Sequence, residues 1–136
     1  MVPALVFLFG ALISFSTGSS WGVWSIMMPI AFPMAVAFDI SIPFVVGAVI
    51  GGGLFGDQCS PISDTTIMAS AGAQCEHVTH VTTQLPYVIT VAAVSFVTYL
   101  IAGFVRNVFI MLVIGFALMI ATLYVIKQIA GNKQTA

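Results

Sequence analysis

Two apolar stretches of this sequence, residues 2–38 and 42–73, are too long for a single membrane crossing, and each contains a polar interruption. As straight α-helices they would be about 55 Å and 48 Å long, whereas the hydrocarbon core of a bilayer is about 30 Å thick. The interruptions are SFSTGSSWG, residues 14–22, and GDQCSPISDTT, residues 56–66. Each half alone, at about 14 to 16 residues, is too short to span the core. We therefore expect both stretches to turn back or break at the polar segments.

The composition places these stretches in a membrane. Of the 136 residues, 60% are hydrophobic and only 5% are charged, whereas a soluble domain carries about 25% charged residues. The apolar runs are continuous and lack the alternating polarity of β-barrel strands. We expect an all-α protein of the cell (inner) membrane, in contact with the lipid bilayer. With a net charge of −1 and three basic residues, it has no basic patch for nucleic acid.

Two later apolar stretches, residues 85–104 and 108–126, each have the length of one crossing, about 30 Å. We expect a polar connector over residues 74–84 and a polar tail over residues 127–136. Lysines in that tail favour a cytoplasmic C-terminus, an assignment that Arg106 at the other end of the last helix partly offsets.

Helix breaks inside a membrane need support from protein or from a water-filled cavity, because lipid cannot satisfy the free backbone groups. Two successive broken segments are typical of secondary transporters, whose substrate sites lie at the breaks. We therefore interpret residues 1–136 as a single transmembrane domain, part of a transporter rather than an enzyme. Such transporters usually consist of two halves, often inverted repeats. The expected partner is a missing N-terminal half or a second copy of the chain.

Two carboxylates, Asp57 and Asp64, lie in the second interruption. A carboxylate at mid-bilayer depth costs about 2.5–3.5 kcal/mol on insertion scales, and burial moves carboxyl titration toward neutral pH. Such a group exchanges H⁺ for Na⁺, which is the basis of a cation/proton exchanger. We interpret Gly56 as the glycine that ends the preceding helix. In the alternative readings, Asp64 only caps the following helix, as Ser63 could also do, and Asp57 is a water-facing loop residue. Hydroxyl oxygens that suit Na⁺ come from Ser60, Ser63, Thr65 and Thr66.

The first interruption carries no charge, and we interpret it as the second wall of the site, with oxygens from Thr17, Ser19 and Ser20. Two alternatives are a polar contact between helices and, because of Trp21, a turn at the membrane surface. Residues 75–80, CEHVTH, contain side chains that bind metals, but their spacing matches no metal-site pattern. We expect a wet connector whose histidines can sense pH. No cofactor is expected, and the metal ion expected is the transported Na⁺.

Residues 56–88, GDQCSPISDTTIMASAGAQCEHVTHVTTQLPYV, closely resemble the signature region of the NhaC-type Na⁺/H⁺ antiporters. Residues 16–31, STGSSWGVWSIMMPIA, resemble the TG-T/S-SWG segment of that family, while Gln58 stands where many members carry histidine. The resemblance implies the C-terminal half of a longer transporter built from inverted repeats. It implies a re-entrant hairpin over residues 2–38 and a broken transmembrane helix over residues 42–73, followed by two full transmembrane helices.

These observations lead to one expected function and two alternatives. The expected function is Na⁺/H⁺ antiport, with the carboxylates of the broken helix exchanging H⁺ for Na⁺. The first alternative is Na⁺- or H⁺-coupled exchange of an organic acid on the same scaffold, since the family includes exchangers of malate and lactate. The second alternative is an inactive truncated half or a structural membrane subunit.

Overall fold

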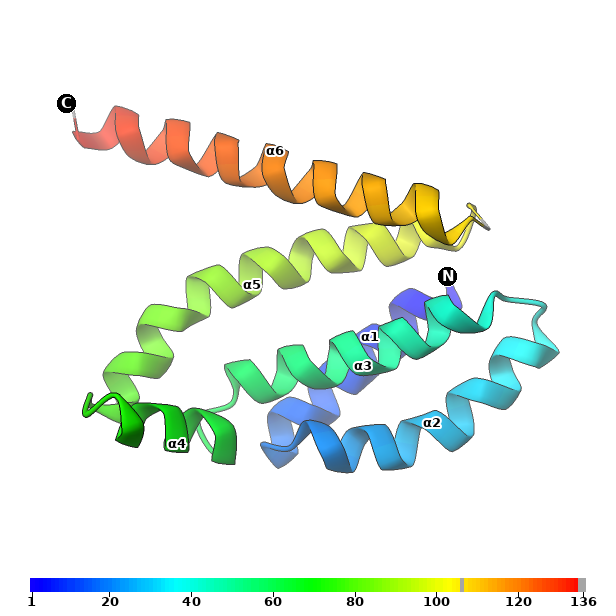
Figure 1. Cartoon of the computed structure of the whole chain (residues 1–136), viewed down its shortest axis with the longest axis horizontal. Coiled ribbons are helices and arrows are strands. Elements are labelled where there is room, and N and C mark those ends of the chain that lie inside the picture. The colour runs from blue at the N-terminus through cyan, green and yellow to red at the C-terminus, as the bar shows by residue number, and fades with distance from the viewer. Residues whose placement is uncertain (106, 135–136) are drawn as a thin grey trace.

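The computed structural model describes residues 1–105 and 107–134, with side chains as far as Gln128, and all its regular elements are helices (Figure 1). The prediction of a cytoplasmic C-terminus depends on Arg106 and on the lysines of the tail. Of these, Arg106 and the side chain of Lys133 lie outside the described residues. The elements are α1 (Val2–Thr17), α2 (Ser20–Ala37), α3 (Ile42–Cys59), α4 (Asp64–Gly72), α5 (His77–Ala102) and α6 (Val108–Gln134).

Both long apolar stretches are divided into two helices, and the divisions fall within the predicted polar segments. The first stretch divides at residues 18–19 and the second at residues 60–63. However, α2 and α3 each have 18 residues, more than the 14 to 16 predicted for each half. By length and composition, four helices are able to cross a membrane, namely α2, α3, α5 and α6, whereas α1 is shorter. The chain is therefore a multi-pass membrane protein.

The predicted polar connector over residues 74–84 is wrong, because α5 already begins at His77. The hydroxyl groups of Thr82 and Thr83 donate to the carbonyl oxygens of Val78 and Thr79, 2.9 and 2.8 Å away. Threonines that bond back to the preceding turn satisfy their polarity within the helix, so this polar segment continues the helix. As a result, α5 has 26 residues and ends at Ala102, in place of the predicted range 85–104.

The predicted tail over residues 127–136 also differs from the structure, because α6 continues to Gln134. A helix longer than the hydrocarbon core can extend into the aqueous layer, where lysine and glutamine side chains remain hydrated. The last apolar helix is therefore longer than the range 108–126 predicted from hydrophobicity.

Helices α1, α2 and α3 form the packed part of the molecule, and α5 and α6 lie beyond it (Figure 1). The most extensive contact joins α1 to α3, where Gly52 and Gly56 face the backbone of α1. A Cβ atom at Gly52 would overlap the carbonyl oxygen of Phe7, and one at Gly56 would overlap that of Ala11. The small-xxx-small spacing thus lets two helix backbones touch. The expectation that Gly56 ends the helix is wrong, since α3 continues to Cys59.

Candidate functional site

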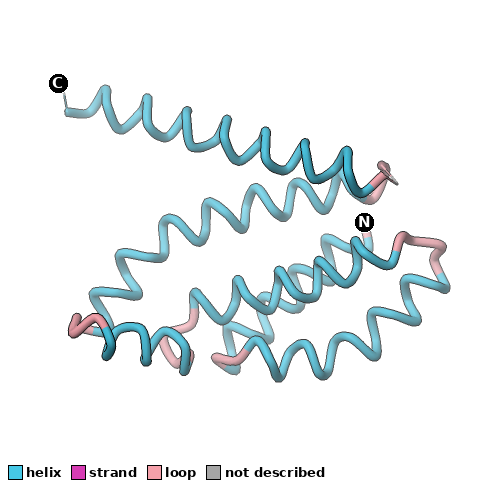
Figure 2. Tube along the Cα trace, in the orientation of Figure 1, coloured by secondary structure: helices cyan, strands magenta, loops and turns pink. Residues whose placement is uncertain are grey.

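The two helix interruptions lie side by side, as the neighbouring loops of Figure 2 show. Gly18 ends α1 with a φ of 66°, a left-handed conformation that glycine adopts without strain. A Cβ atom there would lie 2.7 Å from the carbonyl oxygen of Ile62 in the second interruption. The Ser60 hydroxyl donates to the carbonyl oxygen of Phe15, 2.8 Å away. The structure therefore brings the two polar segments of the sequence together.

Asp57 lies where these segments meet, in the last turn of α3, and is only 3% exposed. The Ser63 hydroxyl donates to its Oδ1, 2.6 Å away. The Ser20 hydroxyl, at the start of α2, donates to its Oδ2, 3.1 Å away. The Thr65 hydroxyl lies 3.4 Å from the same Oδ2. The alternative of a water-facing loop residue is therefore wrong, and three helices contribute to the surroundings of one buried carboxylate.

No lysine or arginine lies near Asp57 in the sequence, since Arg106 is the first of these residues in the chain. The C-terminal end of α3 carries partial negative charge and disfavours an anion. The N-terminal ends of α2 and α4 carry partial positive charge and favour it, as do the hydroxyl donors. Among the described residues, the side-chain hydrogen bonds of the carboxylate therefore come from hydroxyl groups, a setting into which a cation or a proton can enter.

Ser63 connects the carboxylate to α4. Its Oγ accepts from the backbone N–H of Thr66, 3.3 Å away, and thereby caps the helix. The same oxygen lies 2.8 Å from the Thr65 hydroxyl. The hydroxyl of Thr66, a residue that is 3% exposed, has no hydrogen-bond partner among the described residues. A buried hydroxyl without a protein partner is available to bond to an ion or a water molecule.

Asp64 and three hydroxyl residues predicted for the site lie outside the Asp57 cluster. Asp64 is exposed in the first turn of α4, where its carboxylate accepts from the N–H of Thr65, 2.8 Å away. The N-cap position belongs to Ser63, so the alternative reading in which Asp64 caps α4 is wrong. Ser60 is buried but bonds to α1, as described above. Thr17 bonds back to Ile13 in its own helix, and Ser19 precedes α2 without a side-chain cap.

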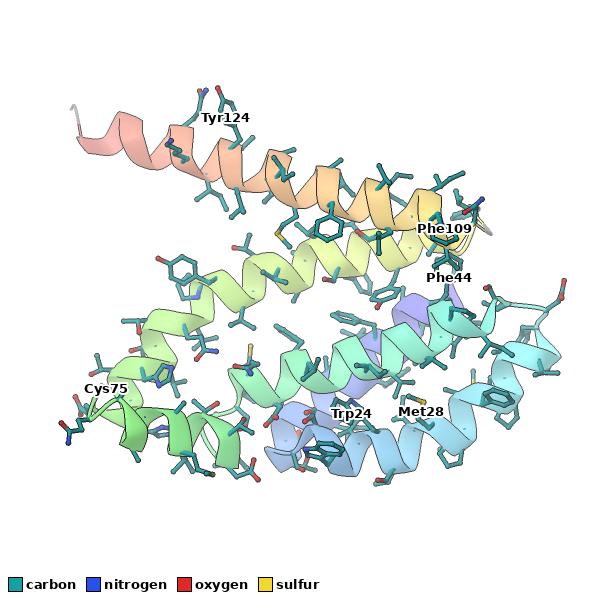
Figure 3. All side chains as sticks on the ribbon, viewed as in Figure 1. Trp24, Met28, Phe44, Cys75, Phe109 and Tyr124 are labelled. Carbon is teal, nitrogen blue, oxygen red and sulfur yellow. The ribbon has the colours of Figure 1, made fainter. Side chains whose placement is uncertain are left out.

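The sequence predictions assigned no role to two polar side chains that lie against Gly53, one turn before Asp57 in α3. Ser14 is fully buried, and its hydroxyl donates to the carbonyl oxygen of Gly53, 2.6 Å away, across the contact of α1 with α3. Trp24 lies between α2 and α3 (Figure 3), with its Nε1 against Gly53 and without a described partner. A signal for Ser14 was present, since Gly10 and Ser14 repeat the four-residue spacing of Gly52 and Gly56.

The sequence is similar to those of known membrane antiporters. The sequence model of the Na⁺/H⁺ antiporter family matches residues 1–104, which include both interruptions and Asp57. The chain belongs to the Na⁺/H⁺ antiporter family. The match ends within the short segment between α5 and α6, so the candidate site lies wholly inside the family region.

Three relatives illustrate what the chain is similar to. An uncharacterized protein of Haemophilus influenzae is 50% identical over 76% of this chain and 20% of its own length. An uncharacterized Na⁺/H⁺ antiporter of the same organism is 40% identical over 62% of this chain and 19% of its own length. The malate-2H⁺/Na⁺-lactate antiporter of Bacillus subtilis is 30% identical over 69% of this chain and 20% of its own length. The chain thus spans about a fifth of these relatives, and no solved structure matches it.

Proposed function

We propose that this chain supplies the cation and proton site of a secondary transporter that exchanges Na⁺ for H⁺. The observation that carries the proposal is Asp57, 3% exposed at the meeting of two helix interruptions and bonded to hydroxyl groups. A buried carboxylate without a basic partner is stabilised by taking up a proton or a cation. Because one carboxylate cannot hold both well, uptake of Na⁺ releases H⁺.

The oxygen atoms near Asp57 suit Na⁺ as the transported ion. Hard cations prefer carboxylate, hydroxyl and carbonyl oxygens. A hydroxyl that donates its proton to Asp57 still has lone pairs for a cation, which applies to Ser20, Ser63 and Thr65. The free hydroxyl of Thr66 supplies a further oxygen. Asp64, Thr17 and Ser19 are assigned the outer part of the site, where their oxygens attract and guide the ion. Ser60, which is buried and bonded to α1, is assigned the role of holding the two interruptions together.

The helix arrangement supports a particular architecture for this transporter. We assign α1 and α2 to a re-entrant hairpin and α3 and α4 to one broken transmembrane helix, with α5 and α6 as full crossings. In Figure 1, α4 continues in the general direction of α3 before α5 returns. Together these elements form one half, the C-terminal half, of an inverted-repeat transporter of the NhaC type in the cell membrane. The remaining half, or a second copy, would complete the walls of the site.

The direct test replaces Asp57 by asparagine in the complete protein that contains this sequence. Na⁺-dependent proton movement is measured in membrane vesicles with a pH-sensitive dye. We expect Asp57→Asn to abolish exchange, because the amide has no charge for Na⁺ and no proton to release. Asp64→Asn should reduce exchange less, since this carboxylate is exposed. Glu76→Gln, at an exposed acidic residue outside the site, is the matched control and should be unaffected. Full exchange by Asp57→Asn would refute the proposal.

Trp24 favours a second candidate function, coupled exchange of an organic acid. Its buried indole N–H has no described partner, and an N–H donor cannot bind Na⁺ but can bind a carboxylate oxygen. One relative is named a malate-2H⁺/Na⁺-lactate antiporter. In this case Trp24→Phe, which keeps the ring but removes the donor, should raise the KM for malate or lactate about tenfold. Flux of Na⁺ that does not respond to either acid would exclude this candidate.

A structural or inactive role differs from both candidates in what the chain does once it is bound to the remaining part of the transporter. Such a subunit would bind the remaining part of a transporter and leave transport unchanged when Asp57 is replaced. Reconstitution of the chain alone and of the complete protein, in parallel, distinguishes the cases. We expect transport only from the complete protein, and loss of it on replacement of Asp57.

A further inference from the structure

A second polar cluster, which shares Thr66 with the Asp57 site, joins α4 to the start of α5 through the hydroxyl of Ser70. Ser70 is 2% exposed, and its Oγ lies 2.8 Å from the carbonyl oxygen of Thr66. The Nδ1 atoms of His77 and His80 lie 3.1 and 2.8 Å from the same oxygen. The Nε2 of His77 lies 2.7 Å from the carbonyl oxygen of Pro61, in the loop between α3 and α4. Two histidines, one hydroxyl and two carbonyl groups therefore form one network.

The donors and acceptors of this network restrict where its protons lie. A carbonyl oxygen only accepts, so the Nε2 of His77 carries a proton that it donates to Pro61. A hydroxyl has one proton to donate and two lone pairs to accept with. Ser70 therefore satisfies all three neighbours only if it donates to Thr66 and accepts from both histidines. In that arrangement both ring nitrogens of His77 are protonated, and the ring is positively charged.

A neutral His77 requires a different arrangement of the same atoms. Its Nδ1 then has no proton and accepts from the hydroxyl of Ser70, which can no longer donate to the carbonyl oxygen of Thr66. Protonation of His77 therefore turns the Ser70 hydroxyl from the ring toward α4. The charged state has one more hydrogen bond, and its bonds from the charged ring are the stronger kind.

We infer that His77 is a second proton-binding site, whose protonation redirects the Ser70 hydroxyl and tightens the junction of α4, α5 and the loop between α3 and α4. Histidine is the side-chain type whose charge ordinarily changes between pH 5 and 8. The loop is also tied to Asp57 through Ser63, 2.6 Å from its carboxylate. The protonation of His77 therefore acts on the loop that contains Ser63, the hydrogen-bond partner of Asp57. This inference does not depend on Asp57 being the ion site.

The carboxylates near the junction of α4 and α5 are bonded outside the Ser70 network, so they do not take the place of His77. The described hydrogen bonds of the nearby carboxylates go elsewhere: Glu76 accepts from Thr79, Asp64 from Thr65, and Asp57 from the hydroxyl groups. Helix α1 has no acidic, basic, cysteine or tyrosine side chain, and α6 diverges from α5 toward this end (Figure 1). The other titratable groups on the surrounding elements are Cys59 in α3, Cys75 in the turn labelled in Figure 3, and His80 and Tyr87 in α5.

The backbone dipoles act in both directions on a charged His77. The residue begins α5, and the N-terminal end of a helix opposes positive charge. The C-terminal part of α4, which contains Ser70, and the carbonyl group of Pro61 favour it. The geometry therefore does not force one state, as is required of a site that changes state with pH.

The first experiment examines the two ring nitrogens directly in the purified wild-type protein. Histidine labelled with ¹⁵N is followed by NMR in detergent micelles between pH 5 and 8.5. We expect the neutral ring of His77 to carry its proton on Nε2, and both nitrogens to be protonated at the acidic end. A ring that carries its proton on Nδ1 at high pH, or that does not titrate in this range, would overturn the inference.

The second experiment measures backbone amide hydrogen exchange in α4 at pH 5.5 and pH 8, corrected for the intrinsic dependence on pH. We expect exchange about two- to tenfold slower at pH 5.5, because one hydrogen bond is gained. His77→Gln should remove this difference, while His80→Gln and Asp57→Asn should retain it. Persistence of the difference in His77→Gln, or its loss in Asp57→Asn, would contradict the inference. If His77→Gln does not fold, the ring measurement decides alone.

Discussion

Helices α3 and α6 differ in a way that reverses the usual relation between hydrophobicity and burial. The most apolar window of α3 has a mean hydropathy of 1.4 and is 50% buried within the protein. The corresponding window of α6 has a mean hydropathy of 2.7, yet only 6% of it is buried. In water the more apolar helix would lie inside, but lipid is as apolar as a leucine side chain and does not drive such helices together. Burial in this molecule therefore follows the fit of small residues rather than hydrophobicity.

The sequences of the two helices explain the difference. α3 contains the run GAVIGGGLFG, whose glycines let α1 approach to backbone contact. α6 begins VFIMLVIGFALMI, whose large side chains fill its surface. Close backbone contact on α3 also places its buried polar residue, Asp57, against α2 and α4, while α6 presents apolar side chains to the bilayer. Packing by small residues is thus what makes a polar site possible in this chain.

The largest expected effect comes from adding one methyl group to the contact of α1 with α3. A Cβ atom at Gly56 would overlap the carbonyl oxygen of Ala11 and lie 2.6 Å from the backbone nitrogen of Phe15. We expect Gly56→Ala to lower the free energy of unfolding by about 2–3 kcal/mol, because neither backbone can move aside. Thermal unfolding in detergent measures the loss.

Gly115 in α6 is the matched control for this change. A Cβ atom there would lie 3.4 Å from a methyl group of Thr98, close to ordinary contact. Gly115→Ala should leave stability unchanged or raise it by up to about 1 kcal/mol, since alanine favours helix. If Gly56→Ala and Gly115→Ala lowered the free energy of unfolding equally, α3 and α6 would not differ in how closely they pack.

The next effect concerns the contact between the two interruptions. Gly18 has a φ of 66°, and a Cβ atom there would approach the carbonyl oxygen of Ile62 to 2.7 Å. We expect Gly18→Ala to cost about 1–2 kcal/mol from the backbone conformation alone. Gly72→Ala, at a glycine with no atom near the added Cβ, should cost nothing. A Gly18→Ala protein with wild-type thermal stability would contradict both the left-handed conformation of Gly18 and its contact with Ile62.

The smallest expected effect concerns two hydroxyl groups, one that bonds to another helix and one that bonds within its own helix. The Ser14 hydroxyl donates to the carbonyl oxygen of Gly53 in another helix, whereas that of Thr98 donates to Val94 one turn back. Ser14→Ala should destabilise the protein by about 1 kcal/mol, because it leaves a buried contact without its donor. Thr98→Val should change stability by less than about 0.5 kcal/mol. The same detergent unfolding assay ranks the pair.

The positions of the two interruptions and the buried Asp57 were predictable, because helix length and carboxylate cost in a bilayer are simple physical limits. The start of α5 was not, since threonines that bond back to their own helix have the same composition as a polar loop. The role of Gly56 was mistaken because a glycine before polar residues suits a helix end as well as a helix contact. Which hydroxyl reaches Asp57 depends on packing: Ser20 does and Ser19 does not, although they are adjacent in the sequence.

The central claim is that Asp57 holds Na⁺ and H⁺ in competition, and Na⁺ binding measured at several pH values tests it most directly. Calorimetric titration of the purified complete protein with NaCl, between pH 6 and pH 8.5, gives the apparent Kd. The account predicts a Kd that rises on acidification, by up to about tenfold per pH unit, because each bound Na⁺ displaces one H⁺. It also predicts no Na⁺ binding by Asp57→Asn. A Kd that is independent of pH, or unchanged in Asp57→Asn, would contradict the account.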